Sequence, residues 1–477
     1  LLETEQGVGE GNGPLVRQQP DGSGPPAGRE TLSAGPWVDR TLYAVTGRLG
    51  DLRAAAAATG FSRVNLLRLA DCSPRNHPDD RVPFMAGLAG HEGHPALAGQ
   101  GEIIDYAVKM RRFSQSGLLS NQVAKLDAGL IDHLAIVLAG FHGEIERAGE
   151  DQSYGEPHKI LFPMQQNFLQ IRNLLDGELE RTQLDRLESW TLAHFAELEE
   201  FLSRRKQMGF IRECHGDLHL GNIALEKGRP IIFDGIEFNP DLRWIDTMSE
   251  LAFILMDLQE KGRPELAQRL LNSYFEASGD YEGAVLLRFY QVYRAMVRAK
   301  VAAIRLSQPD LTGAERTGLQ EEFSAYLRQA LGYTLPVAPA LIVTHGLSGS
   351  GKSTVTAELL MQLPAVRLRS DVERKRLAGL AAEADSRSAT GAGIYTADST
   401  ERTYQRLLAL SEILLRAGFI VIVDATLLKS DQRRRFRDLA AGYRVPYLIL
   451  EFVVPETELR RRVALRSRHG EGVSEAD

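Results

Sequence analysis

The sequence lacks most features of a secreted or membrane-embedded protein. Only two cysteines, Cys72 and Cys214, occur among its 477 residues, and a disulfide framework would need more. No run of 18 apolar residues is present, so the sequence predicts no transmembrane helix. The first residues show no signal-peptide pattern. We therefore expect a cytoplasmic protein without a membrane partner.

Lysine is absent from the first 108 residues, and the first lysine is Lys109. The same region is rich in Gly, Pro, Ala and Arg, with patches such as GEGNGP, DGSGPPAG and RAAAAATG. Its apolar periodicity is poor, which predicts a poorly ordered or degenerate N-terminal region over residues 1–100. A reading-frame error in part of this stretch would produce the same composition.

A large excess of charge of either sign is also missing. The formal net charge is -7 and the pI is near 6.0, which argues against nucleic acid or an anionic membrane as the main partner. The length predicts two or three domains. Because the chain opens with Leu1 and stops in a polar stretch at Asp477, we expect a fragment or a translation of incomplete sequence. The oligomeric state is not predicted.

Hydrophobic patterning predicts a mixed domain over residues 101–333. A strand pattern over 102–110 opens it, and helical stretches follow at 121–148, 165–176 and 184–206. Two strands joined by a Lys-Gly turn are predicted within 223–234, and helices return from 244 to 331.

After a proline-containing linker at 334–339, the pattern becomes α/β over residues 340–477. Helical stretches alternate with buried-strand patterns at 340–345, 365–369, 419–424 and 446–453. Such alternation requires crossover connections and therefore predicts a parallel sheet. The predicted fold class is a multidomain protein of α/β and α+β parts.

The segment GLSGSGKS at 346–353 matches the pattern G-x-x-x-x-G-K-[ST] between a strand and a helix. Glycines let the backbone amides converge on phosphate oxygens, and the helix N-terminus adds positive charge there. Lys352 would reach the β- and γ-phosphates, and Ser353 would bind Mg²⁺. The predicted ATP-binding residues are Gly346, Leu347, Ser348, Gly349, Ser350, Gly351, Lys352, Ser353 and Thr354.

Three further features of this domain each allow two interpretations. Asp424, at the end of the strand FIVIVD, is either a second Mg²⁺ ligand or a strand-end cap. Asp371 is either the base that accepts a hydroxyl proton or part of a helix N-cap with Ser370. The arginine-rich segment 458–472, with Arg462 and Arg466 as lid candidates, is either a segment that closes on the phosphoryl group or a solvated basic helix.

Residues 340–477 resemble the small P-loop kinases, of which gluconate kinase and shikimate kinase are members. The resemblance rests on the strand–GLSGSGKS–helix unit, the SD pair at 370–371, the VIVD strand and the arginine-rich segment. It implies transfer of a phosphoryl group from ATP to a hydroxyl group. That family usually has one more strand after its lid, so we expect this domain to be truncated at its C-terminus.

A second motif, CHGDLHLGNI at 214–223, is followed by IIFDGIEFN at 231–239. Asp217 and Asn222 have the D-x-x-x-x-N spacing of a kinase catalytic loop. These segments resemble the aminoglycoside phosphotransferase and choline kinase families, which share the protein kinase fold. The resemblance implies that Asp217 orients or deprotonates the acceptor hydroxyl, and that Asn222 and Asp234 hold Mg²⁺.

The N-terminal lobe departs from that family. A kinase needs a lysine on an early strand to hold the α- and β-phosphates, and Lys109 comes too late in the chain. We therefore expect a degenerate or missing N-lobe before the C-lobe of the kinase-like domain. The central domain is expected to be weakly active or inactive.

The two motifs together resemble a bifunctional bacterial protein that joins an aminoglycoside phosphotransferase-like domain to a P-loop ATP-binding domain. The main hypothesis is an ATP- and Mg²⁺-dependent kinase for an unidentified small hydroxyl-bearing substrate. Two alternatives stay open. One is an ATP-switched regulatory or binding protein with an inactive kinase-like domain. The other is a polynucleotide 5′-hydroxyl kinase, which the acidic pI disfavours.

Overall fold

The computed structural model describes the backbone of residues 41–44, 63–66, 84–89, 96–97, 103–109, 115–174, 177–382, 384 and 393–469. Side chains are described from residue 115 to 462, apart from the gaps within that range. The chain divides into two compact units, of which the first is formed by residues 1–115 with 237–239 and the second by the remainder.

The described part of the first unit is a five-stranded sheet. Its strands lie in the order β2-β1-β5-β3-β4, with β1 and β2 parallel and the other pairs antiparallel. The bounds are Thr41–Ala44 for β1, Arg63–Leu66 for β2, Phe84–Ala89 for β3, Ala96–Leu97 for β4 and Ile103–Lys109 for β5. The sequence pattern had predicted β5 and none of the four strands before it.

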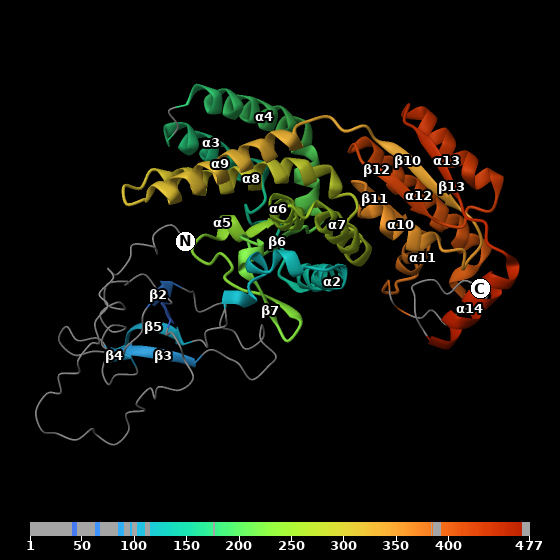
Figure 1. Cartoon of the computed structure of the whole chain (residues 1–477), viewed down its shortest axis with the longest axis horizontal. Helices are drawn as coiled ribbons and strands as arrows, with labels where there is room; N and C mark the ends of the chain where they lie inside the picture. Colours follow the sequence, from blue (N-terminus) through green and yellow to red (C-terminus); the bar gives the residue numbers. More distant parts are fainter. Residues whose placement is uncertain are drawn as a thin grey trace, which may run out of the picture. The chain divides into compact units, whose positions relative to one another are not determined.

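The helical part of the second unit follows (Figure 1). Its α-helices are α2 (Ala128–Glu144), α3 (Pro157–Leu174), α4 (Glu178–Gln207), α5 (Pro240–Arg243), α6 (Thr247–Glu260), α7 (Pro264–Ser278), α8 (Ala284–Leu306) and α9 (Gly313–Tyr333). Two short antiparallel strand pairs accompany them, β6 (Ile211–Glu213) with β9 (Trp244–Asp246) and β7 (Ile223–Glu226) with β8 (Arg229–Ile232). The predicted Lys-Gly turn joins β7 to β8, with both turn residues at positive φ.

The local sequence determines where helix α7, which contacts both domains, begins and ends. It begins with Pro264, where the missing amide hydrogen costs nothing, and ends before Gly279, whose φ of 77° is left-handed. The buried side chains of Leu266, Leu270, Leu271, Tyr274 and Phe275 are spaced at helical intervals. They pack into the large apolar core that also includes parts of α2, α6 and α8.

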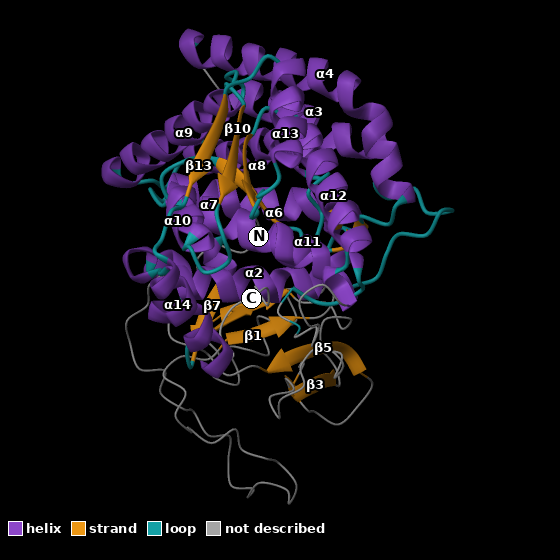
Figure 2. Ribbon diagram, turned by 90° about the vertical axis from the view of Figure 1, so that its right-hand side faces the viewer, coloured by secondary structure: helices purple, strands orange, loops and turns teal. Residues whose placement is uncertain are grey.

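The C-terminal domain contains the predicted parallel sheet. Its strands lie in the order β11-β12-β10-β13, and all three neighbouring pairs are parallel. The bounds are Ala340–His345 for β10, Ala365–Arg369 for β11, Ile420–Asp424 for β12 and Tyr447–Glu451 for β13. These strands agree with the four patterns in the sequence, and Figure 2 shows the sheet strands β10 and β13 together with the surrounding helices.

Five helices accompany this sheet: α10 (Lys352–Leu360), α11 (Ser370–Leu377), α12 (Ala397–Arg416), α13 (Ser430–Gly442) and α14 (Glu456–His469). Continuous apolar strands such as LIV of β10 and VIV of β12 are buried, as expected for strands that are covered on both faces. Over the described residues, none of the helices is long and apolar enough to cross a bilayer.

Candidate functional site

The segment CHGDLHLGN forms a loop between β6 and β7, with a short 3-10 turn at Leu220–Asn222. Gly216 has a φ of 86°, and a Cβ atom at this position would lie 2.7 Å from the carbonyl oxygen of Leu242. Both facts require glycine here, because an L-residue would be strained and would clash. The glycine of the HGD motif is therefore needed for the shape of the loop.

Asp217 and Asn222, the two residues with the spacing of a kinase catalytic loop, lie in direct contact. The Asn222 amide donates to the main-chain oxygen of Asp217 at 2.9 Å and to its Oδ2 at 3.2 Å. Nε2 of His219 lies 3.5 Å from the same carboxylate oxygen. Burial alone would raise the pKa of Asp217, but the hydrogen bond and charge of His219, with the charge of Arg294, lower it to about 2. Asp217 is therefore an anion throughout the neutral range.

Two histidines of the loop have separate contacts. Nε2 of His215 lies 2.7 Å from the main-chain oxygen of Phe233, next to Asp234. His219 had no predicted role. Its Nδ1 accepts the Gly221 amide at 3.0 Å, which fixes the ring beside Asp217. A histidine two residues after the aspartate of HGD is the only sequence signal for this contact.

Asp234 follows β8 and is one of few non-glycine residues with a positive φ, at 65°. That conformation is strained for an aspartate and is often found at functional sites. Burial, followed by the charge of Asp217, raises the pKa of its carboxyl group. A divalent cation beside Asp217 and Asp234 would remove this unfavourable charge, which is the fit expected of metal ligands.

Glu250 of α6, which the sequence patterns did not identify, binds the main chain at the start of the catalytic loop. Its two carboxylate oxygens accept the amides of His215 at 3.1 Å and Gly216 at 2.7 Å, and the side chain is fully buried. Nε2 of His142 from α2 donates to it at 3.1 Å. A charged residue within the apolar run SELAFILM was the available signal.

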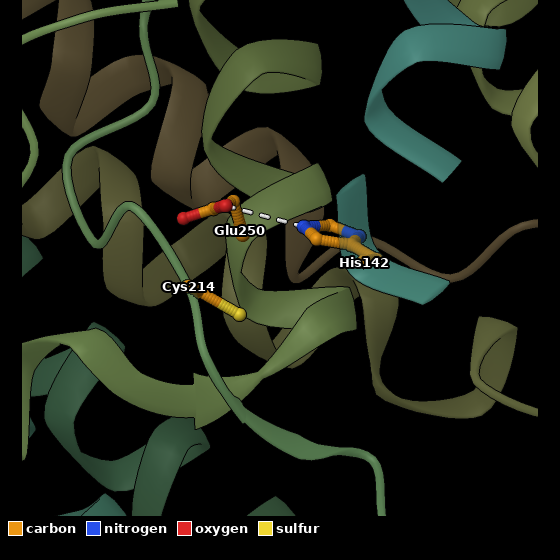
Figure 3. Close-up of side chains that lie close together, drawn as sticks. All are labelled: His142, Cys214 and Glu250. Carbon is orange, nitrogen blue, oxygen red and sulfur yellow. Dashed lines mark hydrogen bonds and ion pairs between the residues drawn. The ribbon is translucent and has the colours of Figure 1, made fainter. Parts of the chain in front are cut away.

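Glu250, His142 and Cys214 offer three potential ligand atoms within 4.8 Å of one another. Figure 3 shows the His142 ring directed at the Glu250 carboxylate, with the Cys214 sulfur nearby. Both carboxylate oxygens and both ring nitrogens already have hydrogen-bond partners, the second ring partner being Tyr274. Burial also raises the pKa of the Cys214 thiol well above its usual range. This cluster is a structural support, and Cys214 is a small buried side chain within it.

The predicted phosphate loop follows β10 directly and leads into α10. Gly346, Gly349 and Gly351 have φ angles of 152°, 84° and 93°, which let the backbone curl at these points. Lys352 is buried to 8% exposure and folds over the loop, where its Nζ donates to the main-chain oxygens of Gly346 and Leu347 at 3.0 and 2.8 Å. Its ammonium group therefore lies at the mouth of a curled loop that opens a helix.

Two more polar side chains near the phosphate loop, Ser350 and Asp424, suit the binding of an anion together with a cation. Ser350 is buried, and its hydroxyl has no hydrogen-bond partner, which is unfavourable unless a ligand supplies one. Asp424, at 4% exposure, accepts a hydrogen bond from Thr356 of α10 at 3.1 Å. A carboxylate beside the start of α10 supports the interpretation of Asp424 as a cation ligand beside Ser353.

Asp371 lies inside the first turn of α11, whose N-cap residue is Arg369. Neither Asp371 nor Ser370 caps the helix, so that alternative was wrong. Burial alone would lower the pKa of Arg369, but the charges of Glu276, Asp424 and Asp371 raise it. Asp371 and Asp424 therefore lie at the same edge of the sheet, where β11 and β12 end.

The two lid candidates lie on α14. Nη1 of Arg462 is 3.7 Å from the position that a Cβ atom on Gly351 would occupy, so its guanidinium lies against the phosphate loop. Glu458 accepts a hydrogen bond from Arg462 Nε at 2.7 Å. Arg466 belongs to the same helix, but its side chain lies outside the described residues.

Comparison with family models gives two matches. A model described as phosphotransferase enzyme family matches residues 66–287, and one described as AAA domain matches residues 341–477. The chain thus joins a kinase-like domain of the phosphotransferase enzyme family to a P-loop domain, as the two resemblances implied. The first match begins before residue 101, where the sequence pattern had placed the start of this domain.

Curated relatives have been found in mycobacteria. The chain is 30% identical over 339 residues to an uncharacterized protein of Mycobacterium tuberculosis strain H37Rv, and equally to one of Mycobacterium bovis. The match covers 70% of this chain and 66% of each relative. The chain therefore spans slightly less than two thirds of the length of these relatives.

Solved structures with similarity to this chain include three kinases. APS kinase from Mycobacterium tuberculosis is 21% identical, with 30% of this chain and 83% of that chain covered and a TM-score of 0.22. A choline/ethanolamine kinase family protein from Mesorhizobium loti is 12% identical, with 60% and 85% covered and a TM-score of 0.32. Plasmodium vivax ethanolamine kinase is 10% identical, with 50% and 66% covered and a TM-score of 0.31.

Proposed function

We propose that this protein is an ATP-dependent phosphotransferase that transfers a phosphoryl group to the hydroxyl group of a small molecule. The observation that carries the proposal is the curled loop 346–351 between β10 and α10, with Lys352 folded over its mouth. The loop amides and the α10 N-terminus would bind the phosphates of ATP. Lys352 would turn from the loop carbonyls to the β- and γ-phosphates, and Ser350 would gain the partner that it lacks.

The cation site of this domain would consist of Ser353 and Asp424. Mg²⁺, when bound, would neutralise charge that develops on the transferred group. Thr356 holds the Asp424 carboxylate by its hydrogen bond and fixes its orientation. Asp371, at the same sheet edge, would accept the proton of the acceptor hydroxyl. Arg462, against Gly351, would close on the phosphoryl group from α14.

The central domain would supply a second kinase-like site. Asp217 would orient the acceptor hydroxyl, because its lowered pKa makes it a permanent hydrogen-bond acceptor. Asn222 and Asp234 would hold Mg²⁺ there. Catalysis at this site also needs a lysine that holds the α- and β-phosphates. Because no lysine precedes Lys109, weak activity or none is still predicted.

The test is incubation of the full chain with γ-labelled ATP, Mg²⁺ and a library of hydroxyl-bearing metabolites. We expect a labelled product that is lost in Lys352→Ala and kept in Asp217→Asn. Slow ATP hydrolysis without a phosphorylated product would instead favour the nucleotide-switched protein. Labelling of oligonucleotide 5′-ends, sensitive to salt, would favour the polynucleotide kinase.

A further inference from the structure

Helix α7 of the kinase-like domain completes the edge of the P-loop sheet. The side-chain amide of Asn272 donates to the Ala365 carbonyl at 2.9 Å, and its Oδ1 accepts the Arg367 amide at 2.7 Å. These two backbone groups lie on the same side of edge strand β11, where a neighbouring strand would otherwise pair. Gln268, one turn earlier, donates to the same Ala365 oxygen.

One turn after Asn272, Glu276 joins α7 to the arginines of β11. Its Oε1 accepts from Arg367 at 2.8 Å, and its Oε2 accepts from Arg369 at 3.1 Å. The three side chains are largely buried, with exposed fractions of 10 to 15%. Removal of the carboxylate charge would deprive both guanidinium groups of the anion that they share through hydrogen bonds.

Arg367 carries this contact into the phosphate site. Its Nη1 donates to the Ser353 carbonyl at 3.1 Å and lies 3.3 Å from the Thr356 hydroxyl. That hydroxyl donates in turn to Asp424 at 3.1 Å. Arg367 therefore links Glu276 directly to the main chain of Ser353, and to Asp424 through the Thr356 hydroxyl.

The opposite face of α7 supports the catalytic loop of the kinase-like domain. Tyr274 lies two residues from both Asn272 and Glu276, which is roughly 200° around a helix. Its hydroxyl is 2.8 Å from Nδ1 of His142, whose other nitrogen donates to Glu250. Glu250 binds the amides at the start of the HGD motif, as described above.

We propose that α7 couples the two phosphotransferase sites, with Glu276 as a positioning residue of the P-loop site and Tyr274 as its counterpart for the catalytic loop. The proposal rests on the proposed function, since it needs nucleotide to bind at residues 346–353. Nucleotide and cation bind most tightly at the P-loop when Arg367 is held in one position. The rigid helix that holds Arg367 also determines how firmly Glu250 is held against the catalytic loop.

The test uses the full chain with Asp234→Asn as the background, so that nucleotide binds at the P-loop alone. Two quantities are measured: the affinity for Mg²⁺ with a fluorescent ADP analogue, and hydrogen exchange of the segment 214–222 with and without saturating ligand. In this background we expect nucleotide to slow exchange of the segment. Glu276→Gln should weaken nucleotide binding about 10-fold and reduce that protection.

Glu265→Gln is the matched control, because Glu265 lies on the same helix and its carboxylate pairs with the neighbouring Arg263 at 2.6 Å. It should change neither quantity. A double-mutant cycle between Glu276→Gln and Arg367→Gln separates positioning from general loosening of the fold. If Glu276 acts through Arg367, the double variant should bind nucleotide about as weakly as the weaker single variant.

The proposal is overturned if Glu276→Gln binds nucleotide as tightly as Glu265→Gln, or if the exchange of 214–222 does not respond to nucleotide. Additive losses in the double-mutant cycle would also overturn it. A background protein that binds no nucleotide would instead refute the proposed function itself. The two failures are therefore distinguishable by the binding curve of the background alone.

Discussion

The guanidinium of Arg205 lies against the carboxylate of Asp246, with Nε and Nη2 donating to its two oxygens at 2.9 and 2.7 Å. The remaining donors of Arg205 bind Asp280 at 2.6 and 2.9 Å. All three side chains are almost fully buried. Asp246 also caps α6 by accepting the Met248 amide, so it supports the helix that carries Glu250.

Arg205→Met should destabilise the protein by about 3–5 kcal/mol, because it leaves two buried carboxylates without their shared cation. Arg204→Met is the matched control: Arg204 is 57% exposed and lies 3.9 Å from Glu282, and its loss should cost within about 0.5 kcal/mol. Urea unfolding of both variants measures the difference. Equal midpoints would show that the buried network adds nothing.

The lowered pKa of Asp217 predicts a specific dependence of stability on pH. Because the folded pKa of about 2 lies below the ordinary value of 3.8, the native state binds fewer protons in that range. The carboxylate therefore contributes about 2 kcal/mol above pH 5, and this contribution falls as the pH decreases toward 2.

Thermal unfolding of wild type and Asp217→Asn between pH 6 and pH 2 provides the measurement. The stability difference between the two proteins should shrink steadily toward the acid end. A difference that stays constant over this range would contradict the lowered pKa. Phosphotransfer that depends on Asp217 should likewise show no acid limb between pH 5 and pH 7.

Asp234 predicts the opposite effect. Its folded pKa is raised, chiefly by burial, so stability falls as the pH rises above the ordinary value of 3.8, and the loss is complete above the folded pKa. In metal-free buffer at pH 7, Asp234→Asn should therefore raise the melting temperature, while at pH 3 it should have little effect. The same variant should lose the stabilisation that Mg²⁺ with ADP gives through the central site.

Asp310→Asn is a suitable control, since Asp310 is an exposed loop residue before α9. It should leave both melting temperatures unchanged. A wild-type protein that is more stable than Asp234→Asn in metal-free buffer at pH 7 would count against the strained, charged Asp234 described above.

Substitution of Ser350 should weaken nucleotide binding without lowering the stability of the ligand-free protein. Because its buried hydroxyl has no partner, Ser350→Ala should leave the ligand-free protein as stable or up to about 1 kcal/mol more stable. It should also weaken nucleotide binding. In contrast, Ser411 is buried with its hydroxyl donating to Leu407 at 2.7 Å, so Ser411→Ala should cost about 1 kcal/mol and leave binding unchanged. Identical behaviour of the two serine variants in differential scanning calorimetry would contradict this account.

Local sequence patterns predicted the groups that act within one segment. The strand before Gly346 was predicted correctly and a curled glycine turn follows it, while Asp217 and Asn222 lie in contact; each feature depends on residues near one another in the chain. That residues 346–353 bind phosphate stays a prediction. The supporting contacts were not predictable in this way. Glu250 and His142 are 108 positions apart in the sequence, and Asn272 and Arg367 are 95 apart, so these contacts are fixed only by tertiary packing.

The helix start at α11 shows the same limit at short range. Ser370 and Asp371 are favourable N-cap residues in sequence, yet the helix begins one residue earlier than that pattern requires, with Arg369 at the cap. Arg369 is held by Glu276 from a helix of the other domain. The tertiary ion pair between Arg369 and Glu276 thus occurs at a helix start where the local N-cap preference of Ser370 and Asp371 is not followed.

The most direct test of the account is calorimetric titration of Mg²⁺ and ADP into Asp234→Asn and into the same background with Lys352→Ala. Exposed Lys429→Ala serves as the control within the P-loop domain. The account predicts one nucleotide per chain in the background and in the control, and binding at least about 100-fold weaker without Lys352. Unchanged affinity in the Lys352 variant would contradict nucleotide binding at residues 346–353.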